Sequence, residues 1–293
     1  MPRIFVPPEK LYSQQRSGFS EEMSPSGEGE EVKGAIRLTG EYHNYLTRVL
    51  RLTINDEVTV FDGEKLCIPA VITAIDAKTV TLSPGDPEGT DAVRGPRTVL
   101  LQGLLKSDKM DLVIRQSVEL GVGVIVPVLC KRSVPHPAGE RAERRLKRWQ
   151  RIVEAACGQC GRVDLPEIMD VQPDIENALA LNSVIQAGDC CEGNAGTGSG
   201  KDAVNQPPDD CWSVVLWEEC KSVSLVGMIP SGLEAKRVVS LLIGPEGGLT
   251  ETETQLCRGA GFRVASLGRL ILRSETAAMA ALTLVSSSAG LLG

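Results

Sequence analysis

The chain has 293 residues, of which 42% are hydrophobic and 24% charged, proportions typical of a soluble globular protein with about two domains. No stretch approaches the ~18 consecutive apolar residues of a membrane span, and the first residues carry charges and prolines where a signal peptide needs an apolar run. We therefore expect a cytoplasmic protein with reduced thiols and no membrane partner, and the net charge of −7 argues against indiscriminate nucleic-acid binding.

Residues 1–84 alternate apolar and polar side chains in short runs, which predicts a small β domain. The expected strands are Ala35–Leu38, Glu57–Phe61, Ile68–Ile75 and Thr79–Leu82. Between the first two, Glu41–Leu50 has helical spacing, and its apolar face would hold Tyr45, Leu46, Val49 and Leu50. Ser13–Lys33 is rich in Ser, Gly and Glu, so we expect a mobile loop there.

Residues 85–96, rich in Pro, Gly and Asp, read as a linker to a second domain at 97–293. Strands and helices alternate in that domain, which predicts a parallel sheet covered on both faces. The expected strands are Thr98–Leu104, Val124–Leu129, Val214–Leu216, Val238–Ile243 and Phe262–Leu267. The expected helices are Lys109–Leu120, Ala138–Cys160, one that begins at Glu251, and Glu275–Ser286. Residues 187–211 form a low-complexity insertion.

Two cysteines three residues apart, Cys157 and Cys160, lie in one of these expected helices. No second cysteine pair with zinc-finger spacing follows, so packing explains the pair better than metal binding. We expect no metal site.

Positive charge gathers in the middle of the chain. Residues 97–151 include 12 basic and 5 acidic side chains, so this segment is basic in an otherwise acidic protein. The pattern is compatible with contacts to RNA phosphates, and equally with a solvated helix face.

The most informative patterns lie near the C-terminus. Leu241–Glu253 (LLIGPEGGLTETE) is an apolar run that breaks at glycines and enters a helix through a capping box of Thr250 and Glu253. Ser266–Ala278 (SLGRLILRSETAA) repeats the arrangement of strand, glycine turn and helix. A glycine-rich loop between a strand and a helix leaves backbone amides free for a ligand, and two such loops could enclose one cofactor.

With these two motifs, further blocks give the chain a resemblance to a known family. The blocks are PRIFVPPEKL (2–11), LTRVLRL (46–52), LLKSDKMDLVIRQSVELGV (104–122), RWQRIVEAACGQCGR (148–162) and LPEI (165–168). In nearly its whole length the sequence resembles the bacterial 16S ribosomal RNA uridine N3-methyltransferases of the SPOUT superfamily. The resemblance implies an α/β fold: a SPOUT-type, trefoil-knotted parallel-sheet domain behind an N-terminal PUA-like β-barrel. It also implies S-adenosylmethionine as cofactor, 16S rRNA in the small ribosomal subunit as substrate, and a homodimer.

Carried over motif by motif, the resemblance assigns roles to individual residues. The cofactor pocket would draw on Leu216, Trp217, Glu218, Ile243, Gly244, Pro245, Glu246, Gly247, Gly248, Ser266, Leu267, Gly268, Leu270, Ile271, Leu272, Thr276 and Ala277. From the chemistry of N3 methylation we hypothesise that Arg273 stabilises the uracil anion, and that Glu275 orients Arg273 or helps to remove the N3 proton. RNA contacts would come from Arg3, Arg48, Arg51, Lys106 and Lys109, with Arg48 and Arg51 sharing one helix face.

The chain departs from the family pattern in two places. Many relatives read L-G-P-R-[IV]-L-R, whereas this chain has Arg269-Leu270 after Leu267-Gly268, and its Leu216–Glu219 is a looser match. Two alternatives therefore stay open. One is a SPOUT methyltransferase that acts on another rRNA or tRNA base, and the other is a non-catalytic RNA-binding or ribosome-assembly protein.

Overall fold

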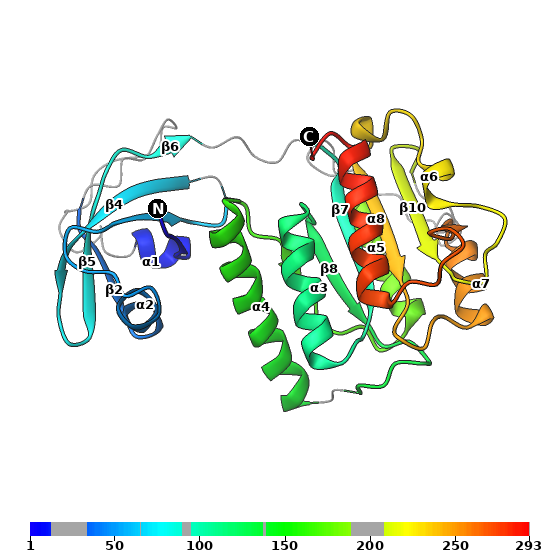
Figure 1. Cartoon of the computed structure of the whole chain (residues 1–293), viewed down its shortest axis with the longest axis horizontal. Coiled ribbons are helices and arrows are strands. Elements are labelled where there is room, and N and C mark those ends of the chain that lie inside the picture. The colour runs from blue at the N-terminus through cyan, green and yellow to red at the C-terminus, as the bar shows by residue number, and fades with distance from the viewer. Residues whose placement is uncertain (13–33, 65, 90–94, 137–138, 189–207, 293) are drawn as a thin grey trace, which may run out of the picture. The chain divides into compact units, whose positions relative to one another are not determined.

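The computed structural model describes residues 1–12, 34–64, 66–89, 95–136, 139–188 and 208–292 (Figure 1). The expected mobile loop at 13–33 and most of the insertion at 187–211 lie outside the described residues. The chain divides into two compact units, Met1–Ala92 with Glu154–Leu165, and Val93–Val153 with Pro166–Gly293. The division falls inside the expected linker, but the segment Glu154–Leu165 joins the first unit, which the sequence did not predict.

The first unit is a small β structure. Its strands are β1 (Arg3–Phe5), β2 (Ile36–Thr39), β3 (Glu57–Phe61), β4 (Leu66–Ile75), β5 (Thr79–Pro84) and β6 (Glu88–Gly89). They form one sheet in the order β1-β3-β4-β5-β2, with β6 paired to β4, and only the β1–β3 pair is parallel. Apolar residues of alternate strand positions, such as Val58, Ile68 and Leu82, are fully buried and form its core. A short helix, α1 (Pro8–Tyr12), follows β1.

The helix expected at Glu41–Leu50 is confirmed over Glu41–Val49, but its second half is a π-helix. Helix α2 (Glu41–Asn44) continues as a π-helix, η1 (Tyr45–Val49), in which the Leu50 amide donates to the Tyr45 carbonyl. The wider turn changes which side chains face inward, so Val49 is 66% exposed while Leu46 is fully buried. Arg51 has a φ of 55° and lies beyond the helix, so Arg48 and Arg51 do not share a helix face.

The second unit is built on a six-stranded parallel sheet. Its strands are β7 (Arg97–Gly103), β8 (Val124–Val128), β9 (Glu167–Ile168), β10 (Cys211–Leu216), β11 (Val238–Ile243) and β12 (Arg263–Ala265). They lie in the order β12-β10-β11-β7-β8-β9, and every pair is parallel. The central strands are buried along their whole length, as expected of a sheet covered on both faces.

Helices cover both faces of this sheet (Figure 1). They are α3 (Ser107–Glu119), α4 (Glu140–Cys160), α5 (Ile175–Gly188), α6 (Leu225–Met228), the 3₁₀-helix η2 (Leu233–Ala235), α7 (Glu251–Gly259) and α8 (Ser274–Ser288). Helices α3 and α8 pack against each other, and α8 also packs on β11. Helices α5 and α7 pack together and share an apolar cluster with Val99, Leu101 and Val126. The parallel α/β fold is therefore confirmed, whereas the trefoil knot stays a prediction.

Three neighbouring strands end at the same level. Leu216, the last residue of β10, pairs with Ile243 at the end of β11 and with Ala265 at the end of β12. The loops that follow these strands therefore leave one edge of the sheet side by side, where ligands bind in open α/β sheets.

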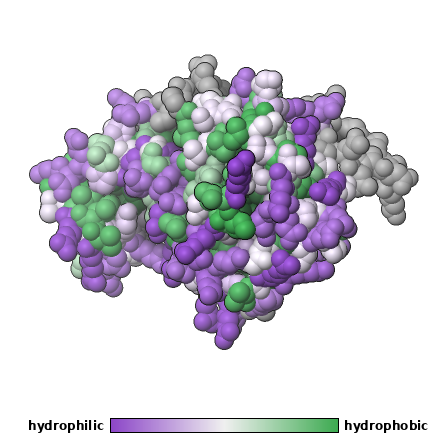
Figure 2. All heavy atoms as spheres, turned by 45° about the vertical axis from the view of Figure 1, so that its right-hand side comes forward, coloured by the Kyte–Doolittle hydropathy of each residue, from purple (hydrophilic) through white to green (hydrophobic). Residues whose placement is uncertain are grey.

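On the face shown in Figure 2, most side chains are hydrophilic. Figure 2 shows apolar side chains in small groups among hydrophilic ones. Among the described residues, no helix has both the length and the apolar character needed to cross a membrane.

Candidate cofactor and active site

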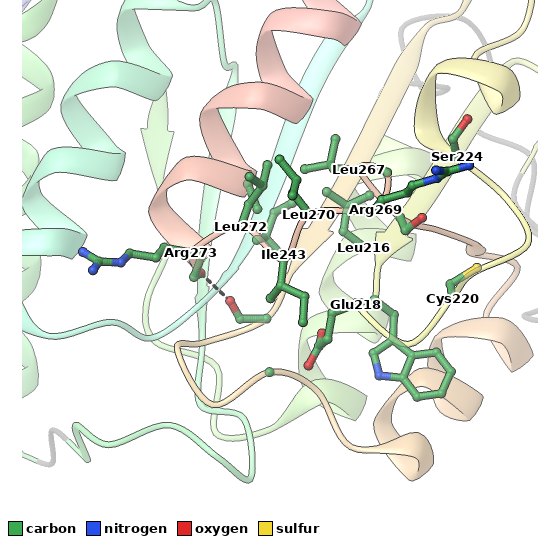
Figure 3. A pocket seen from close by; sticks show the side chains of 18 of the residues that line it. Leu216, Glu218, Cys220, Ser224, Ile243, Leu267, Arg269, Leu270, Leu272 and Arg273 are labelled. Atoms are coloured by element: carbon green, nitrogen blue, oxygen red, sulfur yellow. Dashed lines mark hydrogen bonds between the residues drawn. The ribbon is translucent and has the colours of Figure 1, made fainter.

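A cavity of about 880 Å³ opens where the neighbouring strands β10, β11 and β12 end (Figure 3). Its walls come from three loops, residues 217–224 after β10, 244–248 after β11 and 266–273 after β12. Buried or half-buried apolar side chains line it, among them Leu216, Ile243 and Leu272. With two exceptions, Gly247 and Thr276, all residues that the resemblance assigns to the cofactor line this cavity.

The first exception has a structural explanation. The Gly247 carbonyl accepts a hydrogen bond from Arg132 Nη1 at 3.2 Å, and a Cβ on Gly247 would lie 2.8 Å from Arg132 Cβ. This glycine therefore meets the loop after β8 at close range. Thr276 lies in the first turn of α8, exposed to solvent.

Backbone hydrogen bonds tie the loop after β10 to the loop after β12. The Leu225 amide donates to the Ser266 carbonyl at 2.8 Å, and the Ser266 amide donates to the Val223 carbonyl at 2.9 Å. The Trp217 amide donates to the Ala265 carbonyl at 2.9 Å. These bonds extend the sheet beyond the strand ends, so two walls of the cavity are fixed relative to each other.

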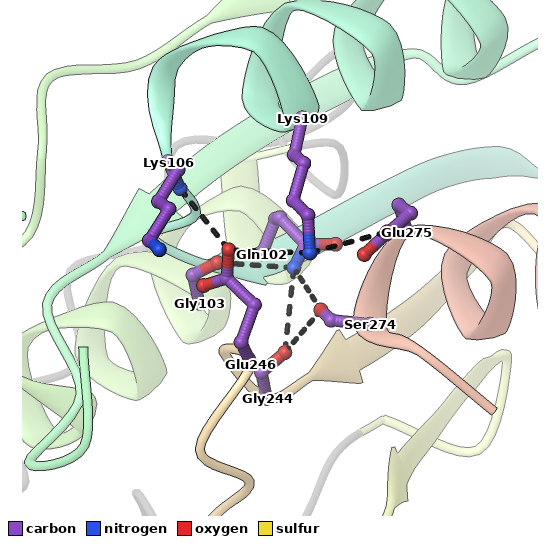
Figure 4. A network of polar contacts seen from close by, with 8 residues as sticks. All are labelled: Gln102, Gly103, Lys106, Lys109, Gly244, Glu246, Ser274 and Glu275. Carbon is purple, nitrogen blue, oxygen red and sulfur yellow. Dashed lines mark hydrogen bonds and ion pairs between the residues drawn. The ribbon is translucent and has the colours of Figure 1, made fainter. Parts of the chain in front are cut away.

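The loop after β11 is held by a buried polar network (Figure 4). Ser274 Oγ donates to the Gly244 carbonyl at 2.5 Å, and Gln102 Nε2 donates to Ser274 Oγ at 3.1 Å. Gln102 is fully buried at the end of β7, beside Gly103. A Cβ on Gly103 would lie 2.5 Å from the Pro245 nitrogen, so the loop rests directly on the strand.

The predicted capping box is confirmed at the start of α7. Thr250 Oγ1 accepts from the Glu253 amide at 3.3 Å, and Glu253 accepts from the Thr250 amide at 2.8 Å. Glu253 is 3% exposed and also accepts from the Lys131 amide at 2.8 Å. One carboxylate thus joins Thr250, at the start of α7, to the loop after β8.

Lys109 stands beside the cavity rather than in an open RNA-contact position. Its Nζ lies 3.2 Å from Glu275 Oε1 and 3.6 Å from Glu246 Oε1 (Figure 4). Glu246 also accepts from the Lys106 amide at 3.3 Å, while the Lys106 side chain is exposed. The second oxygen of Glu275, Oε2, is buried and has no hydrogen-bond partner among the described residues.

Arg273 borders the cavity, but its exposed side chain extends away from the labelled apolar residues (Figure 3). Among the described residues, its guanidinium has no ion-pair or hydrogen-bond partner. Glu275 pairs with Lys109 in this structure, so the expected orientation of Arg273 by Glu275 stays a prediction.

Arg3 is also not an exposed RNA contact. Its guanidinium carbon lies 5.6 Å from the centre of the Phe61 ring, and Nη2 lies 3.6 Å from Cys67 Sγ. Its carbonyl meets Gly158 of α4, where a Cβ would lie 2.9 Å away. Arg3 therefore packs inside the first unit, whereas Arg48 and Arg51 are exposed there.

The packing role expected for Cys157 and Cys160 fits only one of the two cysteines. Cys157 is fully buried, and burial raises the pKa of its thiol to about 12, whereas Cys160 is exposed.

Sequence reasoning missed part of the cavity wall. Arg269, the residue that departs from the family pattern, lines the cavity on the side of Ser224, opposite to Arg273 in the view of Figure 3. The loop after β10 also contributes Cys220, Lys221, Ser222 and Ser224. Because Leu216–Glu219 matches the family pattern only loosely, the residues after it were not predicted as part of the cavity. Their position directly after a buried strand could have indicated them.

A parallel α/β domain with a cavity of this kind at its strand ends is suited to bind a small-molecule cofactor. The family of the RNA methyltransferase domain matches residues 94–286, and the family of the RNA methyltransferase PUA domain matches residues 38–84. The chain belongs to this RNA methyltransferase family, as the sequence motifs predicted.

Similar proteins carry consistent names. "Ribosomal RNA small subunit methyltransferase E" of Bacillus subtilis is 25% identical, covering 89% of this chain and 93% of the relative. The protein of the same name from Synechocystis is 28% identical, covering 87% of this chain and 74% of the relative. A crystal structure of the protein of that name from Neisseria gonorrhoeae, bound to S-adenosyl methionine, is 27% identical, with a TM-score of 0.72 and coverage of 98% and 97%.

Proposed function

We propose that this protein transfers a methyl group from S-adenosylmethionine to N3 of a uridine in 16S rRNA of the small ribosomal subunit. The observation that carries the proposal is the cavity at the level strand ends, where three separate sequence motifs meet. The names of the relatives and the bound cofactor of the Neisseria structure support the substrate and the methyl donor.

The residues present suit this cofactor. A cavity of about 880 Å³ lies within the ~300–1,000 Å³ range of small-molecule sites. Leu216, Ile243 and Leu272 offer apolar walls to the adenine, and the Gly244–Gly248 loop offers backbone polar groups at close range. The exposed carboxylate of Glu218 at the cavity wall suits the ribose hydroxyls or a cationic group. When bound, S-adenosylmethionine supplies an electrophilic methyl group on a sulfonium centre.

The protein then has to position uracil and take its N3 proton. In-line displacement requires the nucleophile about 3–3.5 Å from the methyl carbon. Glu275 Oε2 is the proposed proton acceptor, because it is buried without a hydrogen-bond partner among the described residues, and Lys109, which lines the cavity, pairs with the same carboxylate. Arg273 is the proposed cation for the developing charge on the uracil carbonyl oxygens, because its guanidinium is exposed and unpaired among the described residues.

Two measurements test this function. Mass mapping of rRNA from a strain that lacks the protein should show an unmodified uridine in place of 3-methyluridine, and an intact modification refutes the proposal. In vitro, Arg273→Ala should reduce turnover by at least ~100-fold, the range of one electrostatic contact, while cofactor affinity stays within a few fold. Arg263→Ala, an exposed arginine at the start of β12, is the matched control with normal turnover.

We further propose that the first unit is the RNA-binding domain and that the protein works as a cytoplasmic homodimer, at the site of ribosome assembly. Leu270 and Ile271 are 79% and 82% exposed on the cavity loop, and burying such a pair favours a second copy of the chain. Sedimentation of Leu270→Glu/Ile271→Glu should give a monomer. A wild-type monomer at micromolar concentration contradicts the dimer.

A further inference from the structure

One side of helix α4 carries a stripe of positive charge. Arg141, Arg144, Arg148 and Arg151 follow one another at intervals of three or four residues, so they return to the same side of the helix. The opposite side packs inward, where Trp149 is 2% and Val153 1% exposed. We call the stripe of the four arginines, with Lys147, the basic face of α4.

Basic side chains outnumber acidic ones in this part of α4. Residues 140–151 contain six basic and two acidic side chains, in a chain whose net charge is −7. One of the two acids, Glu140, pairs with Arg144 at 2.6 Å, with side chains 82% and 76% exposed. A pair this exposed is worth little, so Arg144 can exchange it for a phosphate at small cost.

A buried carboxylate links the basic face to the candidate active site. Arg148 Nε and Nη2 lie 3.0 Å and 2.5 Å from Asp111 Oδ2, and this contact holds α4 beside α3. Asp111 follows Lys109 by two residues on α3, and Lys109 lines the cavity. Lys106 precedes the same helix, with its side chain exposed. Helix α3 therefore connects the cavity, through Lys109, to Arg148 of the basic face, through Asp111.

The composition of this face selects among possible partners. Its exposed positions, residues 140, 141, 143, 144, 147, 148, 150 and 151, are all charged or amide side chains. Stable protein interfaces centre on buried aromatic or apolar anchors, and none is exposed here. The guanidinium group of arginine can donate two parallel hydrogen bonds to phosphate oxygens, and a nucleic-acid strand carries a phosphate at every nucleotide.

We infer that the basic face of α4 binds the phosphate backbone of the RNA whose base enters the cavity. The inference rests on the proposed function for the identity of the RNA. Contacts of this kind position the substrate and do not read its sequence.

The test compares two double variants of the full-length protein with equal loss of charge. Arg141→Gln/Arg144→Gln removes part of the basic face, and Arg258→Gln/Arg263→Gln removes two exposed cations of α7 and β12. Each lost phosphate contact should lower the slope of log affinity against log salt by about 0.7 for single-stranded RNA. At ~0.1 M salt this corresponds to about fivefold per contact, so the first variant should bind a 16S rRNA transcript on the order of 25-fold more weakly.

Methyl transfer to small subunits from a strain without the protein gives the second readout. The first variant should show a raised KM for subunits with unchanged kcat and cofactor affinity, and the control should match the wild type. Equal salt slopes for both variants overturn the inference. So does weaker methylation of subunits with unchanged binding to the transcript, since the face would then contact a ribosomal protein. A wild-type protein that binds the transcript but does not methylate refutes the proposed function alone.

Discussion

Gly103 offers a sharp test of how the loop after β11, residues 244–248, is supported. An added Cβ would lie 2.5 Å from the Pro245 nitrogen, 2.7 Å from its Cδ and 2.8 Å from the Gly244 carbonyl carbon. Ordinary contact begins near 3.4 Å, so Gly103→Ala must push the loop from β7 by about 1 Å. Both sides of the contact are backbone, which places the cost near the upper end of the ~1–3 kcal/mol typical of overpacking.

Thermal unfolding and calorimetry with S-adenosylmethionine measure the two consequences. Two to three kcal/mol corresponds to a fall in Tm of about 5–10 °C, and a displaced loop should weaken cofactor binding by at least ~10-fold. Gly259→Ala is the control, because no heavy atom lies within 4 Å of its added Cβ and alanine favours the helix. If Gly103→Ala binds the cofactor and unfolds like the wild type, the loop does not rest on β7 as described.

Two further predictions concern buried ionisable groups. Glu253→Ala removes the acceptor of three hydrogen bonds and should lower the free energy of unfolding in urea by about 2–4 kcal/mol. The control is Glu251→Ala at an exposed position, which should change this free energy by less than ~1 kcal/mol. Equal effects of the two substitutions would contradict the bridging role of Glu253. Burial raises the pKa of the thiols of Cys157 and Cys257 to about 12, so they stay protonated in the folded state while unfolded thiols ionise near pH ~8.5. Their stabilisation is complete below that pH and is lost as the pH rises toward 12, at up to ~1.4 kcal/mol per pH unit and thiol. Cys257→Ala should therefore show a smaller fall in unfolding free energy between pH 8 and 10, and an unchanged fall refutes the assignment.

Local patterns in the sequence were sufficient for the elements that frame the cavity. The apolar run Val238–Ile243 matches β11, and the capping box of Thr250 and Glu253 sets the start of α7. Both signals are contained within a few neighbouring residues, so they do not depend on the rest of the fold.

Helix α5 shows why other elements escaped prediction. Its buried side includes Asn182 and Gln186, which hydrogen-bond Ser240 of β11 and Ser213 of β10. Polar residues on the inner side interrupt the apolar stripe that marks a helix in the sequence. Their partners lie far along the chain, so the pattern becomes intelligible only in the folded sheet.

The same limit applies to charged site residues. Lys109 and Glu275 are 166 positions apart, and only the packing of α3 against α8 brings them into an ion pair. Arg3 looked like an RNA contact, but its guanidinium meets the ring of Phe61 on the neighbouring strand. Sequence motifs predicted most of the residues that line the cavity, whereas contacts between distant parts of the chain decide which partner each charged side chain has.

The pairing of Leu216 with both Ile243 and Ala265 makes the catalytic geometry a property of the sheet. A slip of β10 by one residue would displace its loop by ~3.3 Å and exchange the two faces of the strand, so the core and the cavity would fail together. Activity should therefore disappear abruptly rather than drift as mutations accumulate in these strands. Loss of methylation would then indicate that the strands of the sheet have shifted in register.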